Sequence, residues 1–209
     1  MISPYYERNR KGETGYLARD PAGIEYKDNI TVQLNVPYTI GVHEGEVNGV
    51  KVVFLHHSEI FPIPYPDNGC LETVKQLAVF GKACLEYCCK RTLIPSVCVT
   101  NDWFTGLIPG YAKIGAFGDT FKGTTFFHIA HNLEPTYEGR LFPQPNQGAL
   151  EYLHQLPREW LCDPRWSQLV INPSRCAIML SDQWGTVSPS YKQDLINQSP
   201  LNDLLKQKS

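Results

Sequence analysis

Short apolar runs alternate with an amphipathic segment along this chain, and the alternation limits the folds that it can adopt. The run at 50–55 is apolar almost throughout, which is typical of a strand buried on both faces. Between 71 and 88, apolar positions recur every three or four residues, which predicts a helix. A strand at 97–100, a short helix at 104–112 and a strand at 124–130 follow. This order predicts βαβ units in an α/β fold, with a mostly parallel sheet and flanking helices.

Segments on either side extend the pattern. Alternating apolar residues at 30–36 and 38–42 predict strands and a hairpin, broken by Pro37 and by the stretch 41–49. Near the other end we expect a polar segment at 134–165, a helix-like run at 169–180, a strand at 184–187 and a last helix. Ser188 followed by Pro189 predicts where that last helix starts, because serine caps a free backbone amide and proline needs none there.

Charge and length restrict the class of protein. The 209 residues carry 19 Lys and Arg against 21 Asp and Glu, a formal net charge of −2. Nucleic-acid binders usually present a basic face, so this balance argues against one. The sequence holds no run of about 18 apolar residues, the length needed to cross a membrane. We therefore expect a single globular domain with neither nucleic acid nor membrane as a partner.

Cysteine usage and the N-terminal sequence predict the compartment. The seven cysteines are odd in number and scattered, which fits a reducing environment. Cys84 and Cys88 share one face of the predicted helix, where packing explains them better than metal or redox chemistry. The first residues have neither the basic start nor the apolar run of a signal peptide. We expect a cytoplasmic protein, or a plastid one if a transit peptide lies upstream of Met1.

The carboxyl ends of the predicted strands identify candidate site residues, because ligands of parallel α/β sheets bind there. These ends fall at 100–103, 131–133 and 186–189. Asp102 and Trp103 combine a carboxylate, which hydrogen-bonds sugar hydroxyls, with a ring that stacks on sugars. The competing interpretation is that Asp102 only caps the next helix and that Trp103 belongs to the core.

The histidines allow two interpretations. His131 follows a buried strand with Asn132 beside it, and can be either a site residue or a hydrogen-bonded structural group. His128 lies inside the strand, so we assign it to the core. A zinc site built from His128, His131, His56 and His57 lacks any standard ligand spacing. The sequence also lacks the hydrolase, P-loop and dinucleotide-binding fingerprints.

Taken together, the motifs resemble one known family. The segment 99–109 looks like the H-x-D-W-x-x-G-L-x-P block of starch and glycogen synthases, and 126–133 with 137–139 resembles their F-T-x-H-N-L-x-Y-Q-G block. The segment 186–191 is similar to T-V-S-P-x-Y, and 65–68 to the Y-x-D-N that precedes a helix. The motifs follow the family order from Tyr65 to Tyr191.

This resemblance implies a fold and an activity. The family has two Rossmann-like domains, the GT-B arrangement, and transfers glucose from ADP- or UDP-glucose to the non-reducing end of an α-1,4-glucan, with retention and without a metal or cofactor. The chain resembles part of the N-terminal, acceptor-side domain. The first βα unit, with its K-T-G-G-L loop, and the donor domain would lie outside residues 1–209. We therefore expect the chain alone to be marginally stable and inactive.

The resemblance also assigns roles to residues. His131 and Asp102 would be catalytic, with His131 beside the transferred glucose and Asp102 on the cleft floor. Asn132, Trp103, Tyr65 and Tyr137 would bind substrate. Two departures are visible: residues 134–136 lengthen the loop before Tyr137, and Thr100 and Asn101 replace the usual histidine. The alternative is a non-catalytic glucan-binding or scaffolding module, and a GT-B transferase acting on sucrose or trehalose precursors fits the motif pairing less well.

Overall fold

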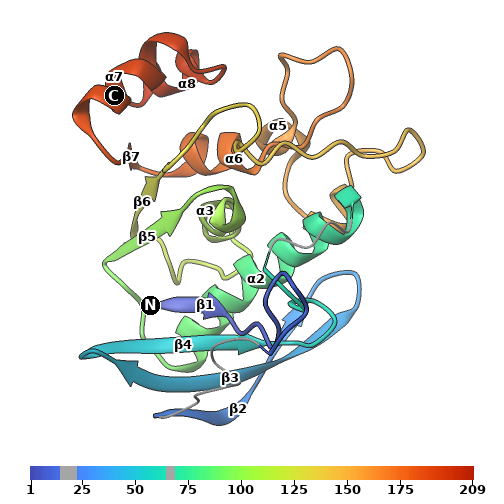
Figure 1. The fold of residues 1–209 in the computed structure, drawn as a ribbon, viewed down its shortest axis with the longest axis vertical. Helices are drawn as coiled ribbons and strands as arrows, with labels where there is room; N and C mark the ends of the chain where they lie inside the picture. Colours follow the sequence, from blue (N-terminus) through green and yellow to red (C-terminus); the bar gives the residue numbers. More distant parts are fainter. Residues whose placement is uncertain (15–22, 65–68) are drawn as a thin grey trace.

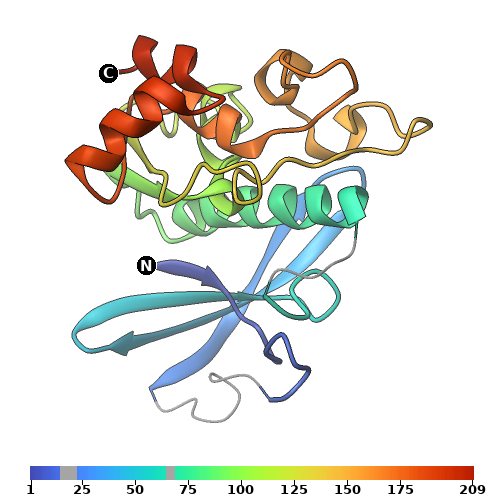
Figure 2. The same ribbon diagram turned by 45° about the horizontal axis from the view of Figure 1, so that its top comes forward.

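The computed structural model describes residues 1–14, 23–64 and 69–209, and in them two sheets share one long helix. A four-stranded sheet has the order β1-β4-β3-β2 and a three-stranded sheet the order β5-β6-β7. Helix α2 (Gly69–Lys90) runs between the first sheet and the rest of the chain (Figures 1 and 2). Its central residues are buried, including Val74, Leu77, Val79 and Phe80. The helix predicted at 71–88 is therefore confirmed.

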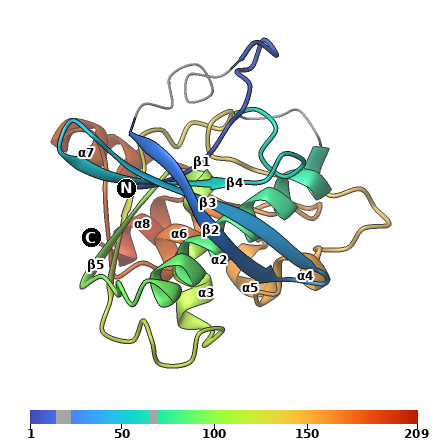
Figure 3. The ribbon, with the colours of Figure 1, turned by 90° about the horizontal axis from the view of Figure 1, so that it is seen from below.

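The first sheet is mixed. Strand β1 (Ile2–Pro4) pairs in parallel with β4 (Val50–His56), while β2 (Ile24–Gln33), β3 (Pro37–Val47) and β4 pair antiparallel. Its alternate residues Ile30, Val32, Ile40 and Val42 are buried, as their period of two predicts. Figure 3 looks onto the outer face of this sheet, with α2 behind it.

One sequence expectation in this sheet is wrong. The sequence predicts that the stretch 41–49 interrupts the strand, but β3 continues to Val47 and the chain turns only at Asn48 and Gly49. Both of these residues have positive φ, 51° and 77°, which is the backbone of an Asn-Gly hairpin turn. Position 45 within the strand needs a glycine, because a Cβ there would lie 2.1 Å from the carbonyl oxygen of Gly23.

The second sheet is parallel throughout. Strand β5 (Val97–Asn101) pairs with β6 (Thr125–Ile129), which pairs with β7 (Gln183–Gly185). Three of the five strand pairings in the described residues are parallel. The α/β class, the strand at 97–100 and the strand at 124–130 are thus confirmed, and the strand predicted at 184–187 lies one to two residues earlier.

Prolines set the starts of the helices around this sheet. The helix predicted at 104–112 is two elements, the 3-10 turn η1 (Trp103–Thr105) and α3 (Ile108–Lys113), with Pro109 in the first turn of α3. The run at 169–180 is helical only from Pro173, as α6 (Pro173–Leu180), because Ile171 is extended and bridges Leu141 and Cys162. Short helices α4 (Glu151–His154) and α5 (Arg158–Leu161) lie in the expected polar segment.

The last helices pack as a small separate cluster. Helix α7 (Pro189–Gln198) begins as predicted, with Ser188 Oγ accepting the amide of Tyr191 at 3.1 Å, and α8 (Asn202–Gln207) follows. Leu195, Leu201 and Leu205 pack with Trp184 of β7. No helix in the described part of the chain is long and apolar enough to cross a membrane.

Candidate functional site

The carboxyl ends of β5 and β6 are joined by one side chain. Asn101 pairs with Ile129 at the end of the parallel ladder, and the amide of Asp102 donates to the Ile129 carbonyl at 2.9 Å. The Asp102 carboxylate then accepts the backbone amide of His131 at 2.7 Å. Asp102 makes no side-chain cap to η1. The capping interpretation is therefore wrong, and the two predicted catalytic residues are in direct contact.

The backbone of Asp102 is strained. Its φ of 53° and ψ of −178° lie in a region that is occupied almost only by glycine. The hydrogen bonds to Ile129 and His131 hold it there, and Thr105 Oγ1 donates to the carbonyls of Asn101 at 2.8 Å and of Asp102 at 3.2 Å. Strain of this kind concentrates at functional sites, and here it aims a carboxylate across two strands.

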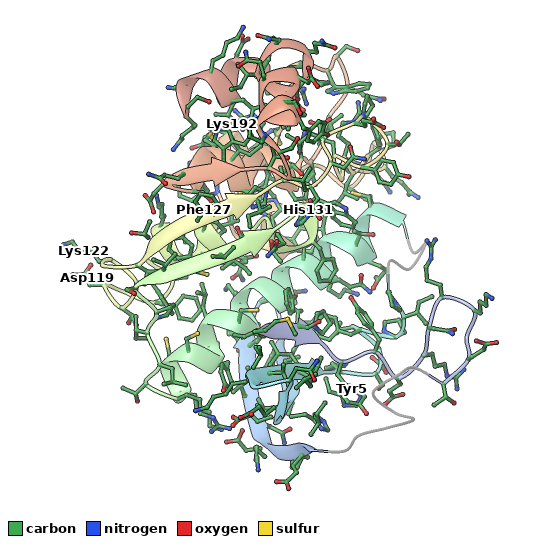
Figure 4. All side chains as sticks on the ribbon, turned by 60° about the vertical axis from the view of Figure 1, so that its left-hand side comes forward. Tyr5, Asp119, Lys122, Phe127, His131 and Lys192 are labelled. Carbon is green, nitrogen blue, oxygen red and sulfur yellow. The ribbon has the colours of Figure 1, made fainter. Side chains whose placement is uncertain are left out.

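The side chains of His131 and Asn132 differ in how they are held. His131 is exposed, and its Nε2 lies 3.1 Å from Asn101 Oδ1. Asn132 Oδ1 accepts the amide of Glu134 at 2.8 Å and lies 3.4 Å from the hydroxyl of Tyr191, which also accepts the Leu133 amide. Figure 4 shows His131 at the opposite end of β6 from Asp119 and Lys122, which precede the strand.

Trp103 packs so closely against Gly139 that a side chain at position 139 would displace the indole or the backbone. Gly139 has a φ of 76°, and a Cβ there would lie 2.3 Å from Cγ of Trp103. The same turn carries Tyr137, which is 60% exposed. The two aromatic rings predicted to bind substrate therefore come from neighbouring loops, with the backbone of Gly139 against one of them.

A cleft of about 750 Å³ brings these residues together. Four of the predicted site residues line it: Asp102, Trp103, Asn132 and Tyr137. His131, the neighbour of Asn132 in the chain, is not among the residues that line it. Tyr65 lies outside the described residues.

Sequence reasoning missed part of the lining of the cleft. Tyr6 and Arg10, from the segment after β1, line it together with Asn101 and Phe104. Among the described residues that line the cleft, Arg10 and Asp102 are the only ones of the types Lys, Arg, His, Asp and Glu. The T-V-S-P-x-Y motif pointed to Tyr191, which contacts Asn132. No sequence signal placed Tyr6 or Arg10 in the cleft.

His128 belongs to the core, as expected. It is 0% exposed, and its Nδ1 lies 2.9 Å from Thr100 Oγ1. Burial, with a smaller contribution from the charge of His131, lowers the pKa of His128 from 6.5 to about 3.

Within residues 1–14, 23–64 and 69–209, no group of three or more His, Cys, Asp or Glu side chains could hold a metal ion. Burial also raises the pKa of Cys88 to about 11, so this thiol stays protonated and packs as an apolar group.

Comparisons with known proteins point to one family. A family model for the starch synthase catalytic domain matches residues 1–207. The glycogen synthase of Lachnospira eligens is 33% identical over 158 residues, covering 75% of this chain and 32% of that protein. Glycogen synthase 2 of Geobacter sulfurreducens is 28% identical over 204 residues, covering 94% of this chain and 39% of that protein.

A solved structure shows the same fold. The catalytic domain of starch synthase IV from Arabidopsis thaliana, bound to ADP and acarbose, matches with a TM-score of 0.77 at 21% identity, covering 99% of this chain and 42% of that one. The chain therefore spans well under half the length of each of these relatives. The match supports a partial GT-B glycosyltransferase fold.

The strain at Asp102 predicts that glycine at this position gives a more stable protein than alanine, the reverse of the usual order. Asp102→Gly and Asp102→Ala both remove the acceptor for the His131 amide, but only glycine relaxes the backbone. We expect the glycine variant to be more stable by about 1 kcal/mol or more, despite its greater unfolded-state entropy, in urea unfolding. An alanine variant as stable as the glycine variant would contradict the strain.

Buried His128 predicts a loss of stability in acid. The unfolded chain protonates this imidazole below pH 6.5 while the folded chain keeps it neutral down to about pH 3, so stability falls through that window. We expect this group to cost about 2 kcal/mol between pH 7 and pH 5. Urea unfolding at both pH values should show that His128→Gln loses this part of the dependence; an unchanged dependence would count against a neutral His128.

Proposed function

The chain belongs to the starch synthase catalytic domain family, and from this premise we propose that it forms the acceptor-binding part of a glucan synthase. The parent enzyme transfers glucose from ADP- or UDP-glucose to the non-reducing end of an α-1,4-glucan, with retention. The observation that carries the proposal is the cleft, in which Asp102, Trp103, Asn132 and Tyr137 converge at the strand ends.

The cleft has the chemistry that a sugar chain requires. The rings of Trp103 and Tyr137 can stack on the less polar faces of sugar rings, while Asp102, Asn132 and Asn101 offer oxygen and nitrogen atoms to hydroxyl groups. Stacking orients a sugar without occupying its hydroxyls, so both kinds of contact act together.

We assign the catalytic contributions to His131 and Asp102. Glucosyl transfer passes through a positively charged, oxocarbenium-like centre, which nearby carbonyl and carboxylate oxygens stabilise. Asp102 holds the His131 backbone through a 2.7 Å hydrogen bond. The His131 ring lies 3.1 Å from Asn101, which lines the cleft, and we propose that the transferred glucose binds next to this histidine. The proposed mechanism uses no metal and no cofactor.

We also propose that transfer requires polypeptide beyond residues 1–209. The relatives are more than twice as long as the part that this chain matches. An apolar hollow of about 200 Å³ separates the two sheets and is lined by Ile2 of β1 and by Cys98 and Val99 of β5. Neither β1 nor β5 pairs with a strand across this hollow in the described residues. Both facts support an acceptor-side unit completed by a further βα unit and a donor domain.

The remaining assignments follow from the family. The partners are the α-1,4-glucan and, in the parent enzyme, the nucleotide sugar; the bound ADP and acarbose of the Arabidopsis structure support this pair. Seven cysteines, all free, support a cytoplasmic location.

Because the chain spans only part of the length of its relatives, we predict that it is inactive by itself. Residues 1–209 alone should incorporate no glucose from radiolabelled ADP-glucose or UDP-glucose into maltoheptaose. Glycogen synthase 2 of Geobacter sulfurreducens serves as the positive control. Incorporation above background by the isolated chain would contradict the need for a donor domain.

We predict that maltoheptaose binding depends on the two aromatic residues of the cleft, Trp103 and Tyr137, and not on an exposed aromatic residue elsewhere. By calorimetry, Trp103→Ala and Tyr137→Ala should each weaken maltoheptaose binding at least about tenfold, a loss of about 1.4 kcal/mol. The matched control is Tyr26→Ala, since Tyr26 is 55% exposed, much like Tyr137 at 60%, but lies on β2 outside the cleft. Equal effects of Tyr137→Ala and Tyr26→Ala would place the glucan elsewhere.

A further inference from the structure

Two buried carboxylates, Glu138 and Asp163, are paired with two arginines next to Tyr137 in the chain. Glu138 is 0% exposed, and its Oε1 accepts from Arg165 Nη2 at 2.7 Å and from Asn172 Nδ2 at 2.6 Å. Arg140 Nε lies 3.3 Å from the other oxygen, Oε2. Asp163, 4% exposed, accepts from the same Asn172 amide at 3.0 Å and from Arg165 Nε at 2.6 Å. Two carboxylates and two guanidinium groups make the cluster electrically neutral.

Stability is a poor explanation for this cluster. Taking charged groups out of water costs free energy that their mutual attraction often fails to recover, and apolar residues in the same space are frequently more stable. Burial acts to raise the pKa of Asp163, but the hydrogen bonds from Arg165 and Asn172 outweigh it and lower this pKa.

The cluster is connected to the cleft through the backbone. Glu138 lies between Tyr137, which lines the cleft, and Gly139, whose backbone packs on the indole of Trp103. The carbonyl of Glu138 accepts from Ser174 Oγ at 2.7 Å, so the start of α6 holds its main chain while the charges hold its side chain.

The same start of α6 also contacts the loop that carries Trp103. A Cβ on Gly106 would lie 2.3 Å from the carbonyl oxygen of Pro173, so the two backbones are in close contact. Asn172 caps α6 by accepting the Arg175 amide at 3.0 Å and donates to Glu138 with its other end. The α6 start therefore fixes the turn on one side of Trp103 and the η1 loop on the other.

We infer that Glu138 is a positioning residue: its buried carboxylate, paired with Arg140 and Arg165, holds Gly139 against Trp103 and thereby sets the orientation of the indole in the cleft. The inference rests on the proposed glucan binding for its consequence, but the orientation of Trp103 is a property of the free chain. It assigns to Glu138 a role that it exerts without touching the sugar.

The first test is a double-mutant cycle on binding. Glu138→Gln keeps the shape and an acceptor oxygen but removes the charge, and should weaken maltoheptaose binding about tenfold. In a Trp103→Phe background the same substitution should change the affinity less than about threefold, because the group through which it acts is already altered. Equal losses in both backgrounds would overturn the inference.

The matched control is Glu44→Gln. Glu44 on β3 accepts from Arg91 Nε at 2.7 Å, so this variant also breaks a carboxylate–arginine pair, but one away from the cleft. We expect it to leave the affinity unchanged. An effect equal to that of Glu138→Gln would show a general loss of stability and would overturn the assigned role.

A second readout requires no ligand. In chain labelled with 5-fluorotryptophan, the fluorine resonance of Trp103, assigned by its absence from Trp103→Phe, should shift or broaden in Glu138→Gln and remain in place in Glu44→Gln. An unmoved resonance in folded Glu138→Gln would overturn the inference. If the wild-type chain binds no maltoheptaose, the proposed function fails and this resonance alone decides the role of Glu138.

Ser174→Ala covers the case in which Glu138→Gln does not fold. It removes only the hydroxyl that donates to the Glu138 carbonyl. The same resonance should then shift in the same direction by a smaller amount, and an unchanged resonance in folded Ser174→Ala would contradict the connection between α6, Glu138 and Trp103.

Discussion

One hydrogen bond, from the backbone amide of His131 to the carboxylate of Asp102, determines the geometry of the site. It can form only because β5 and β6 are parallel and in register, with Asn101 opposite Ile129, so that both strands end at the same edge. Asp102 adopts a backbone conformation that costs free energy in order to make it. Trp103 and Asn132, the next residues along each chain segment, then face the same cleft.

Helices α2 and α7 and the residues around Glu138 support this edge of the sheet. Helix α2 contributes Phe80 to the cleft and packs against β2 of the first sheet as well as against η1, α3 and α4, so the cleft lies between β1, α2 and the end of β5. The hydroxyl of Tyr191 in α7 contacts Asn132 and the Leu133 amide in the loop after β6. Further along the same loop, Arg165 pairs with Glu138. A sugar-binding surface requires this support, because a ring that stacks on a sugar must keep its orientation without the ligand.

Local patterns in the sequence predicted most elements and the meeting of the strand ends. Helix α2, strands β5 and β6 and the Ser188 cap follow from periodicity and capping chemistry, which depend on neighbouring residues only. The errors have tertiary causes: β3 continues through 41–47 because it has strands on both sides, and Ile171 is extended because it bridges two distant segments. The pairing of Glu138 with Arg165, 27 residues away, and the approach of Tyr6 and Arg10 to the cleft depend on the assembled fold and leave no local signal.

The central claim is that a glucan binds at the common edge of these strands. The most direct measurement is a titration of the isotope-labelled chain with maltoheptaose, following every backbone amide by NMR. We expect the largest shifts on Asp102, Asn132 and Tyr137, with the amide of Tyr26 on the outer sheet unmoved. Shifts concentrated on another face, or none at saturating sugar, would contradict it.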